Sequence, residues 1–307
     1  MSNRNFQISL LRQGVSVWNS WREEFPSISV DLSEGKFPSL DLKGVNFSGA
    51  RLKNCNFNRS NLSEADLTNT ILEGGSYIES NLSETDISNS KAKGCDFSNA
   101  TMTGCKISNS DFTDSNFSRS SMASIQGTNA KFDDCDFTRV NIKGCRILDS
   151  SLKRIKASKV DFSGSLLTGS DFSESQLPKV KFIGCNLDRC SFEKSSLRDC
   201  KLRESSGIGA NFRECNANSA DFREGNFSNS DFTKSDLRFA DFFDSAFNSS
   251  NFSFANMSGA FFEEGSFYKA NFQNANLSFA NLDDADFQQS NLQGANLLES
   301  SKVDTIF

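Results

Sequence analysis

The residues of this sequence whose type and spacing could do chemistry are its nine cysteines, which occur in a chain of 307 residues without a single histidine. Cysteine thiolates bind metals and act as nucleophiles, and pairs of cysteines form disulfides. No two of these cysteines have C-x-x-C spacing, and no histidine base or glycine-rich phosphate loop accompanies them. The pattern therefore indicates neither a metal centre nor an enzyme, and we expect no catalysis and no cofactor. The nine residues are Cys55, Cys95, Cys105, Cys135, Cys145, Cys185, Cys190, Cys200 and Cys215.

The cysteines share one position in a five-residue period. Each stands two residues before a position that is reached in steps of five from Phe37. Of the 53 such positions between Phe37 and Leu297, 48 are Leu, Phe, Ile, Met or Tyr, and 23 of the 31 Phe fall on them. A helix repeats apolar residues every 3.6 positions and a strand every 2, so the period fits neither. It predicts a chain that turns a corner every five residues and points the large residue, and the small one two before it, inward.

The pattern is clearest in SADFREGNFSNSDF and in KANFQNANLSFANLDDADFQQSNLQGANL. Over residues 31–300 the sequence resembles the pentapeptide-repeat family, in which four pentapeptides form one square coil. The resemblance implies an all-β solenoid, a right-handed quadrilateral β-helix of about 13 coils and roughly 65 Å in length at ~4.8 Å per coil. A short α-helical cap is expected at its N-terminal end. We accordingly assign residues 1–30 to a capping region, residues 31–300 to the β-helix and residues 301–307 to a short C-terminal tail.

This geometry gives the cysteines a packing role. Residues that stack directly are 20 apart, and no two cysteines have that separation. Those 40 apart are about 10 Å from each other, beyond the roughly 7 Å between Cα atoms that a disulfide spans. Cys185 and Cys190, on adjacent faces, are a pair for which the sequence leaves a disulfide open. We predict small buried residues in a reducing compartment, and therefore a cytoplasmic protein.

Both ends of such a stack need covering. Residues 8–25, ISLLRQGVSVWNSWREEF, have the pattern of a helix that stops before Pro26. We expect it to cap the first coil; the alternative is a helix that binds a partner. At the other end, Val303, Ile306 and Phe307 either fold over the last coil or pair with another copy. Some relatives dimerise through this end, so the resemblance adds a homodimer as a candidate assembly. Neither a secretory signal nor a membrane-spanning run is visible, so we expect no membrane partner.

The outer surface is the remaining place for function. Residues 1–130 carry a net charge of −2, residues 131–203 carry +5 and residues 204–307 carry −9. The total of −6 argues against direct nucleic-acid binding. Two sets of outward residues in the last third are candidate sites, although a solvated surface and aromatics lying flat along a corner are the plain alternatives. The aromatic set is Phe239, Phe243, Phe261 and Phe279, and the acidic set is Asp221, Glu224, Asp231, Asp236, Asp241 and Asp244.

We predict a non-catalytic scaffold that binds an unidentified protein partner through the aromatic set. The alternative comes from the resemblance, since quinolone-resistance members of the family imitate duplex DNA and bind DNA gyrase. In that case the acidic set would face gyrase or another topoisomerase. The modest net charge and the unbroken repeat register, which carries no loop, favour the scaffold.

Overall fold

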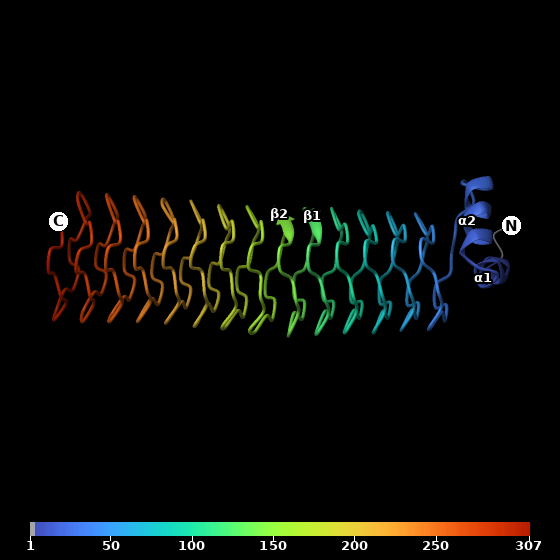
Figure 1. The fold of residues 1–307 in the computed structure, drawn as a ribbon, viewed down its shortest axis with the longest axis horizontal. Coiled ribbons are helices and arrows are strands. Elements are labelled where there is room, and N and C mark those ends of the chain that lie inside the picture. The colour runs from blue at the N-terminus through green and yellow to red at the C-terminus, as the bar shows by residue number, and fades with distance from the viewer. Residues whose placement is uncertain (1–3) are drawn as a thin grey trace. The chain divides into compact units, whose positions relative to one another are not determined.

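The structure is a computed structural model that describes residues 4–307. The chain divides into two compact units, one ending at Ser151 and the other comprising Leu152–Phe307. Within each unit, successive turns of the backbone stack on one another (Figure 1). Residues 20 positions apart pair in parallel within these stacks, as Asp31 does with Arg51 and Asp221 with Asp241. The predicted fold class, a right-handed quadrilateral β-helix with an N-terminal helical cap, is confirmed.

The ladder consists mostly of single bridges, because each pairing residue is followed at once by a turn. Leu32 donates its N–H to Arg51 O at 2.9 Å, and Arg51 donates its own to Val30 O at 2.9 Å. Bridges lengthen into three-residue strands at β1 (Gln126–Thr128) and β2 (Arg146–Leu148), which pair in parallel with Gly127 opposite Ile147. Figure 1 shows these two strands on neighbouring coils of the first unit.

Every corner contains a residue in the left-handed conformation. In the turn that starts at Leu42, Val45 donates its N–H to Leu42 O at 3.1 Å, and Gly44 has φ +68°. A positive φ at the third residue is the mark of a type II turn. Asn and Asp tolerate this conformation better than most residues, and they recur there, for example at Asn99 and Asp114.

The polar residue between the two inward columns also has a structural task. The side chain of Asp66 accepts the N–H of Thr68 at 2.9 Å, which fixes the start of the turn. Asn residues in this position bond to one another between coils, as Asn271 Nδ2 does to Asn251 Oδ1 at 3.1 Å.

The interior is filled by the large column. Side chains 20 residues apart stack face to face: the rings of Phe212 and Phe232 have centroids 4.5 Å apart and an interplanar angle of 3°. Where the large residue is missing, a neighbour occupies its volume. A Cβ added at Gly207 would lie 2.4 Å from Cδ1 of Phe227, so that ring already fills the space. In the described part of the chain, stacked side chains therefore fill the interior.

The small column does more than fill space. The thiol of Cys105 donates to Leu82 O at 2.9 Å, and the hydroxyl of Ser110 donates to Ile87 O at 2.7 Å. Cysteine and serine thus make the same bond to a carbonyl 23 residues earlier. All nine cysteines are buried and none forms a disulfide. Cys185 and Cys190 each donate to a different carbonyl, of Phe162 and Leu167, at 3.1 and 3.0 Å.

Two helices cover the first coil of the first unit. They are α1 (Arg4–Arg12) and α2 (Val15–Glu24). Trp18 is fully buried against Phe47 and donates its indole N–H to Asn46 O at 2.7 Å. Asn19 accepts the N–H of Asn46 and donates to Gly44 O, each at 2.9 Å. No coil precedes the first one, so some of its backbone groups lack a partner within the stack. Side chains of the helices form hydrogen bonds with these groups instead.

The prediction of one helix over residues 8–25 is wrong. The helical pattern begins earlier, at Arg4, and it breaks between Arg12 and Val15. Gly14 has φ +114° and ψ 163°, a conformation open to glycine and strained for residues with a Cβ, and it directly precedes the first residue of α2. Because of this break, Val17 and Phe25 lie exposed while Leu11 and Trp18 are buried.

The ladder also continues past residue 300, the predicted end of the β-helix. Asn281 pairs with Ser301, and Asp286 pairs with Ile306. Phe307 stands in register with the large column and stacks on Phe287, with ring centroids 5.8 Å apart. Several apolar side chains in this last stretch are exposed, namely Leu298, Val303, Ile306 and Phe307.

We expect the thiols to be inert in the native protein. Burial raises the pKa of Cys105 to about 12, so at about pH 8 only on the order of one such thiol in 10⁴ is ionised. Titration with a disulfide reagent such as DTNB should therefore be slow for the folded protein and should release all nine thiols after unfolding in guanidinium. A fast native phase would contradict the inward placement of the small column.

Candidate functional site

The predicted aromatic residues lie on the surface of the second unit. Phe239, Phe261 and Phe279 are 57%, 45% and 58% exposed, whereas Phe243 is partly buried. Phe239 and Phe279 occupy left-handed turn positions, with φ of 58° and 60°. Gly259 lies between them in the stack. A Cβ added to Gly259 would lie 2.7 Å from Cε1 of Phe239, so the Phe239 ring covers this glycine. The Phe239 ring thus lies along the corner but stays more than half exposed.

Phe243 and Phe261 line a hollow of about 380 Å³, which we name the aromatic–acidic hollow. Its other lining residues are Arg223, Asp241 and Glu263. Arg223 Nε lies 2.9 Å from Asp221 Oδ1 and 3.4 Å from Asp241 Oδ2. Burial raises the pKa of Asp241, and the nearby carboxylates of Asp221 and Glu263 add to that effect. One guanidinium is therefore shared between two carboxylates beside two aromatic rings.

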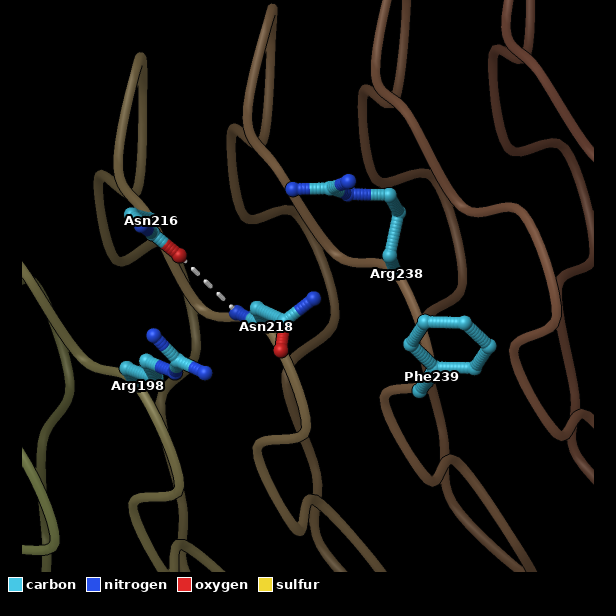
Figure 2. A pocket seen from close by; sticks show the side chains of 5 residues that line it. All are labelled: Arg198, Asn216, Asn218, Arg238 and Phe239. Carbon is cyan, nitrogen blue, oxygen red and sulfur yellow. Dashed lines mark hydrogen bonds between the residues drawn. The ribbon is translucent and has the colours of Figure 1, made fainter.

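Phe239 lines a second hollow of about 280 Å³, which we name the arginine hollow. Arg198, Asn216, Asn218 and Arg238 complete its lining. Figure 2 shows Asn218 between the two arginines, with the guanidinium of Arg238 extended back toward the coil of Asn218. Arg198, Asn218 and Arg238 are successive members of one column, each 20 residues from the next. The predicted aromatic set is thus divided, since Phe239 and the pair of Phe243 and Phe261 line different hollows.

The predicted acidic set is largely neutralised by ion pairs. Besides the sharing of Arg223, Asp231 Oδ2 lies 3.0 Å from Arg213 Nη1, and Asp236 Oδ2 lies 2.7 Å from Arg238 Nη2. Hydrogen bonding from Arg238 lowers the pKa of Asp236. Four of the six carboxylates therefore have a guanidinium partner, and only Glu224 and Asp244 have no ion pair within 4 Å among residues 4–307.

A row of carboxylates that overlaps the predicted acidic set at Glu224 and Asp244 runs along the second unit. Its members are exposed turn residues that follow one another every 20 positions, about 4.8 Å apart. Arg203 lies 3.7 Å from the first of them, and within the described part of the chain the others have no such ion-pair partner. The sequence carries this row as a spacing of 20, and the predicted acidic set includes only two of its members, Glu224 and Asp244. The row consists of Glu204, Glu224, Asp244, Glu264, Asp284 and Asp304.

Two classes of site find no support among residues 4–307. No group of three or more Cys, Asp or Glu residues there is arranged to hold a metal ion. In the same range, no helix is long and apolar enough to cross a membrane.

Family models match most of the chain. The model for a pentapeptide repeat region matches residues 76–152, 125–196 and 175–243, and the model for pentapeptide repeats in eight copies matches residues 41–74, 226–263, 245–278 and 270–301. The chain belongs to the pentapeptide-repeat family. No curated protein matches it.

Solved structures of other pentapeptide-repeat proteins are similar to this chain. HetL, a protein involved in heterocyst differentiation regulation from the cyanobacterium Nostoc sp. strain PCC 7120, is 18% identical over 94% of this chain and 92% of its own, with a TM-score of 0.26. Full-length QnrB1, a plasmid-mediated fluoroquinolone resistance protein, is 16% identical over 88% and 92%, with a TM-score of 0.29. Rfr23 from the cyanobacterium Cyanothece 51142 is 21% identical over 41% and 90%, with a TM-score of 0.28.

In this pentapeptide-repeat protein we expect Phe279→Gly to raise the free energy of unfolding by about 0.5–1 kcal/mol, because glycine relieves a left-handed φ that is strained for phenylalanine. The measurement is the midpoint of thermal unfolding by circular dichroism. Phe272→Gly, which empties a buried position, is the control and should lower the free energy of unfolding strongly. A loss of stability in Phe279→Gly would mean that the exposed ring serves packing rather than contact.

Proposed function

We propose that this pentapeptide-repeat protein is a non-catalytic scaffold that binds a protein partner through Phe239, Phe243, Phe261 and Phe279. The observation that carries the proposal is the exposure of Phe239 and Phe279 at left-handed turns. A bulky residue there is strained, and its ring adds little to the core, so packing does not account for it. Aromatic side chains and arginine are the residues most enriched in the energetic centres of protein interfaces.

The cysteines bear on the cellular compartment of the protein. Nine thiols without a disulfide suit a reducing compartment, so we place the scaffold in the cytoplasm. We include a homodimer through the C-terminal end in the proposal, because Leu298, Val303 and Phe307 are exposed there.

The test is quantitative capture of cross-linked partners by the purified protein and by the triple variant Phe239→Ser, Phe243→Ser, Phe261→Ser. We expect the variant to lose the partner, because the apolar contact area is removed. Phe254→Ser is the matched control, since Phe254 has the same left-handed φ of 60° and is 55% exposed, but belongs to a different column. Retention of every partner by the triple variant would defeat the proposal.

A second candidate function is a DNA mimic that binds DNA gyrase or another topoisomerase, and the row of carboxylates from Glu204 to Asp304 favours it. Residues 204–307 carry nine net negative charges over about five coils, or roughly 25 Å. Duplex DNA carries about 15 over that length. The ion pairs of Asp221, Asp231, Asp236 and Asp241 work against the imitation, so we rank this function second.

The assay for the mimic is supercoiling by gyrase with and without ciprofloxacin in the presence of the purified protein. A mimic would inhibit supercoiling or protect it from the drug. Replacing Glu224, Asp244 and Glu264 by Gln should then abolish the effect, because the row loses half its charge. Absence of both inhibition and protection in the unmodified protein would remove gyrase from consideration.

A further inference from the structure

The arginine hollow has a donor-rich lining, of which the fold itself uses only a part. Arg198, Asn218 and Arg238 follow one another in a single column, so the two arginine Cα atoms are separated by two coil spacings, or ~9.6 Å. Asn218 stands between them, one spacing from each. A planar group held near Asn218 can therefore reach both guanidinium groups (Figure 2).

The amide orientations are set by hydrogen bonds. Asn218 Oδ1 accepts the hydroxyl of Ser219 at 3.0 Å, which leaves Nδ2 as the end of the amide that is open to a ligand. Asn216 Oδ1 accepts the backbone N–H of Asn218 at 3.2 Å, so the Nδ2 group of Asn216 is likewise open to a ligand. Among residues 4–307, neither nitrogen has a hydrogen-bond acceptor. The two amides thus present donors to the hollow.

The two arginines are held differently. Arg238 forms a fork with Asp236, through Nε at 2.8 Å and Nη2 at 2.7 Å, so Nη1 and the outer edge of the guanidinium remain available. Arg198 Nε lies 4.0 Å from Asp199 Oδ2, which is a charge contact beyond hydrogen-bond distance. Its side chain is 65% exposed. Arg198 can therefore turn its whole donor edge toward a ligand.

The geometry of the donors, and not the net charge, favours one kind of anion. Two guanidinium groups and the carboxylates of Asp199 and Asp236 sum to zero at the hollow, so charge alone distinguishes little between anions. The preference must therefore come from the shape of the anion and from the apolar group beside it. Two N–H groups of a guanidinium match the two oxygens of a carboxylate. The exposed ring of Phe239 offers apolar contact beside it.

We propose that the arginine hollow binds a carboxylate carried on an apolar segment of the protein partner, with Arg198 and Asn218 as its main donors and Phe239 against the apolar part. This rests on the proposed scaffold function, whose partner it describes more closely. The hollow would anchor an acidic side chain or a chain terminus of the partner. It is independent of the row of carboxylates, which would attract the opposite charge.

The test uses small probes in place of the partner. Protein labelled with ¹⁵N-arginine is titrated with phenylacetate, acetate, inorganic phosphate and phenethylammonium, each against sodium chloride at equal ionic strength, and the arginine Nε–H signals are followed by NMR. We expect a saturable shift of the Arg198 signal with phenylacetate, weaker binding of acetate because it lacks the ring, and none of the ammonium compound. Phosphate should bind more weakly than phenylacetate.

Variants locate the site. Asn218→Asp should weaken the binding of phenylacetate by more than about tenfold, because it replaces a donor by a repelling acceptor of the same size. Arg198→Gln should weaken this binding by about tenfold. Arg213→Gln is the control, since Arg213 is half-buried, pairs with Asp231 at 3.0 Å and lies outside the hollow; it should leave binding of phenylacetate unchanged. No shift beyond the salt control, binding unaffected by Asn218→Asp, or a preference for phosphate would each overturn the inference.

The two proposals fail separately. If the protein does not bind phenylacetate but the aromatic triple variant still loses the partner, only the inference about the arginine hollow is defeated. Saturable binding of phenylacetate with no partner captured defeats the scaffold function alone. If both hold, Asn218→Asp should also weaken capture of the partner by about tenfold; undiminished capture would show that the partner does not use the hollow.

Discussion

Within each unit of this protein, each coil is held to the next by backbone hydrogen bonds between residues about 20 positions apart, and these bonds require the coils to turn at the same places. Leu32 to Arg51 in the first unit and Leu202 to Asp221 in the second follow one rule, with lengths of 2.9 and 2.7 Å. A corner shifted by one residue would unpair the backbone and turn the large column outward, as a register slip does in a sheet. The requirement explains why glycine is not needed at each corner. A residue such as Glu264, with φ 57°, is held in a strained conformation because the coils before and after it fix the corner.

The same register creates columns on the outer surface, and the columns are the units of any function. Side chains 20 apart repeat at about 4.8 Å, close enough to act together. Six carboxylates form one row in this way, and Arg198, Asn218 and Arg238 form part of another. Because the interior is filled by stacked rings such as those of Phe212 and Phe232, the exterior is where a partner can be recognised. Membership of the pentapeptide-repeat family identifies this architecture, whereas the exterior residues decide what binds.

Opposite charges pair on neighbouring columns of the second unit, and this pairing neutralises much of the acidic segment, residues 204–307. Arg223 and Arg238 each hold carboxylates that, by residue type alone, appear to make a continuous negative surface. What remains is one row of exposed carboxylates, the aromatic–acidic hollow, which is lined by both signs of charge, and the arginine hollow, whose charged lining residues are both arginines. Aromatic rings line both hollows. A surface of this kind suits a specific protein contact better than it suits imitation of a uniformly charged polymer.

The sequence alone determined the corner every five residues, the inward columns and the burial of the cysteines, because each depends on a local pattern that the stack repeats; the four-sided coil came from the resemblance to the pentapeptide-repeat family. Phe37 and Leu297 mark that register, and the burial of Cys55 or Cys215 follows from it. The break at Gly14 escaped prediction, since one glycine in an apolar periodic segment is compatible with a continuous helix. The tertiary structure alone decided which long side chains meet. Arg223 reaches Asp241 from 18 residues away, and Asn218 turns its amide nitrogen outward because Ser219 occupies its oxygen. Such contacts depend on the rotamers of flexible side chains on adjacent coils, and a linear pattern carries no information about them.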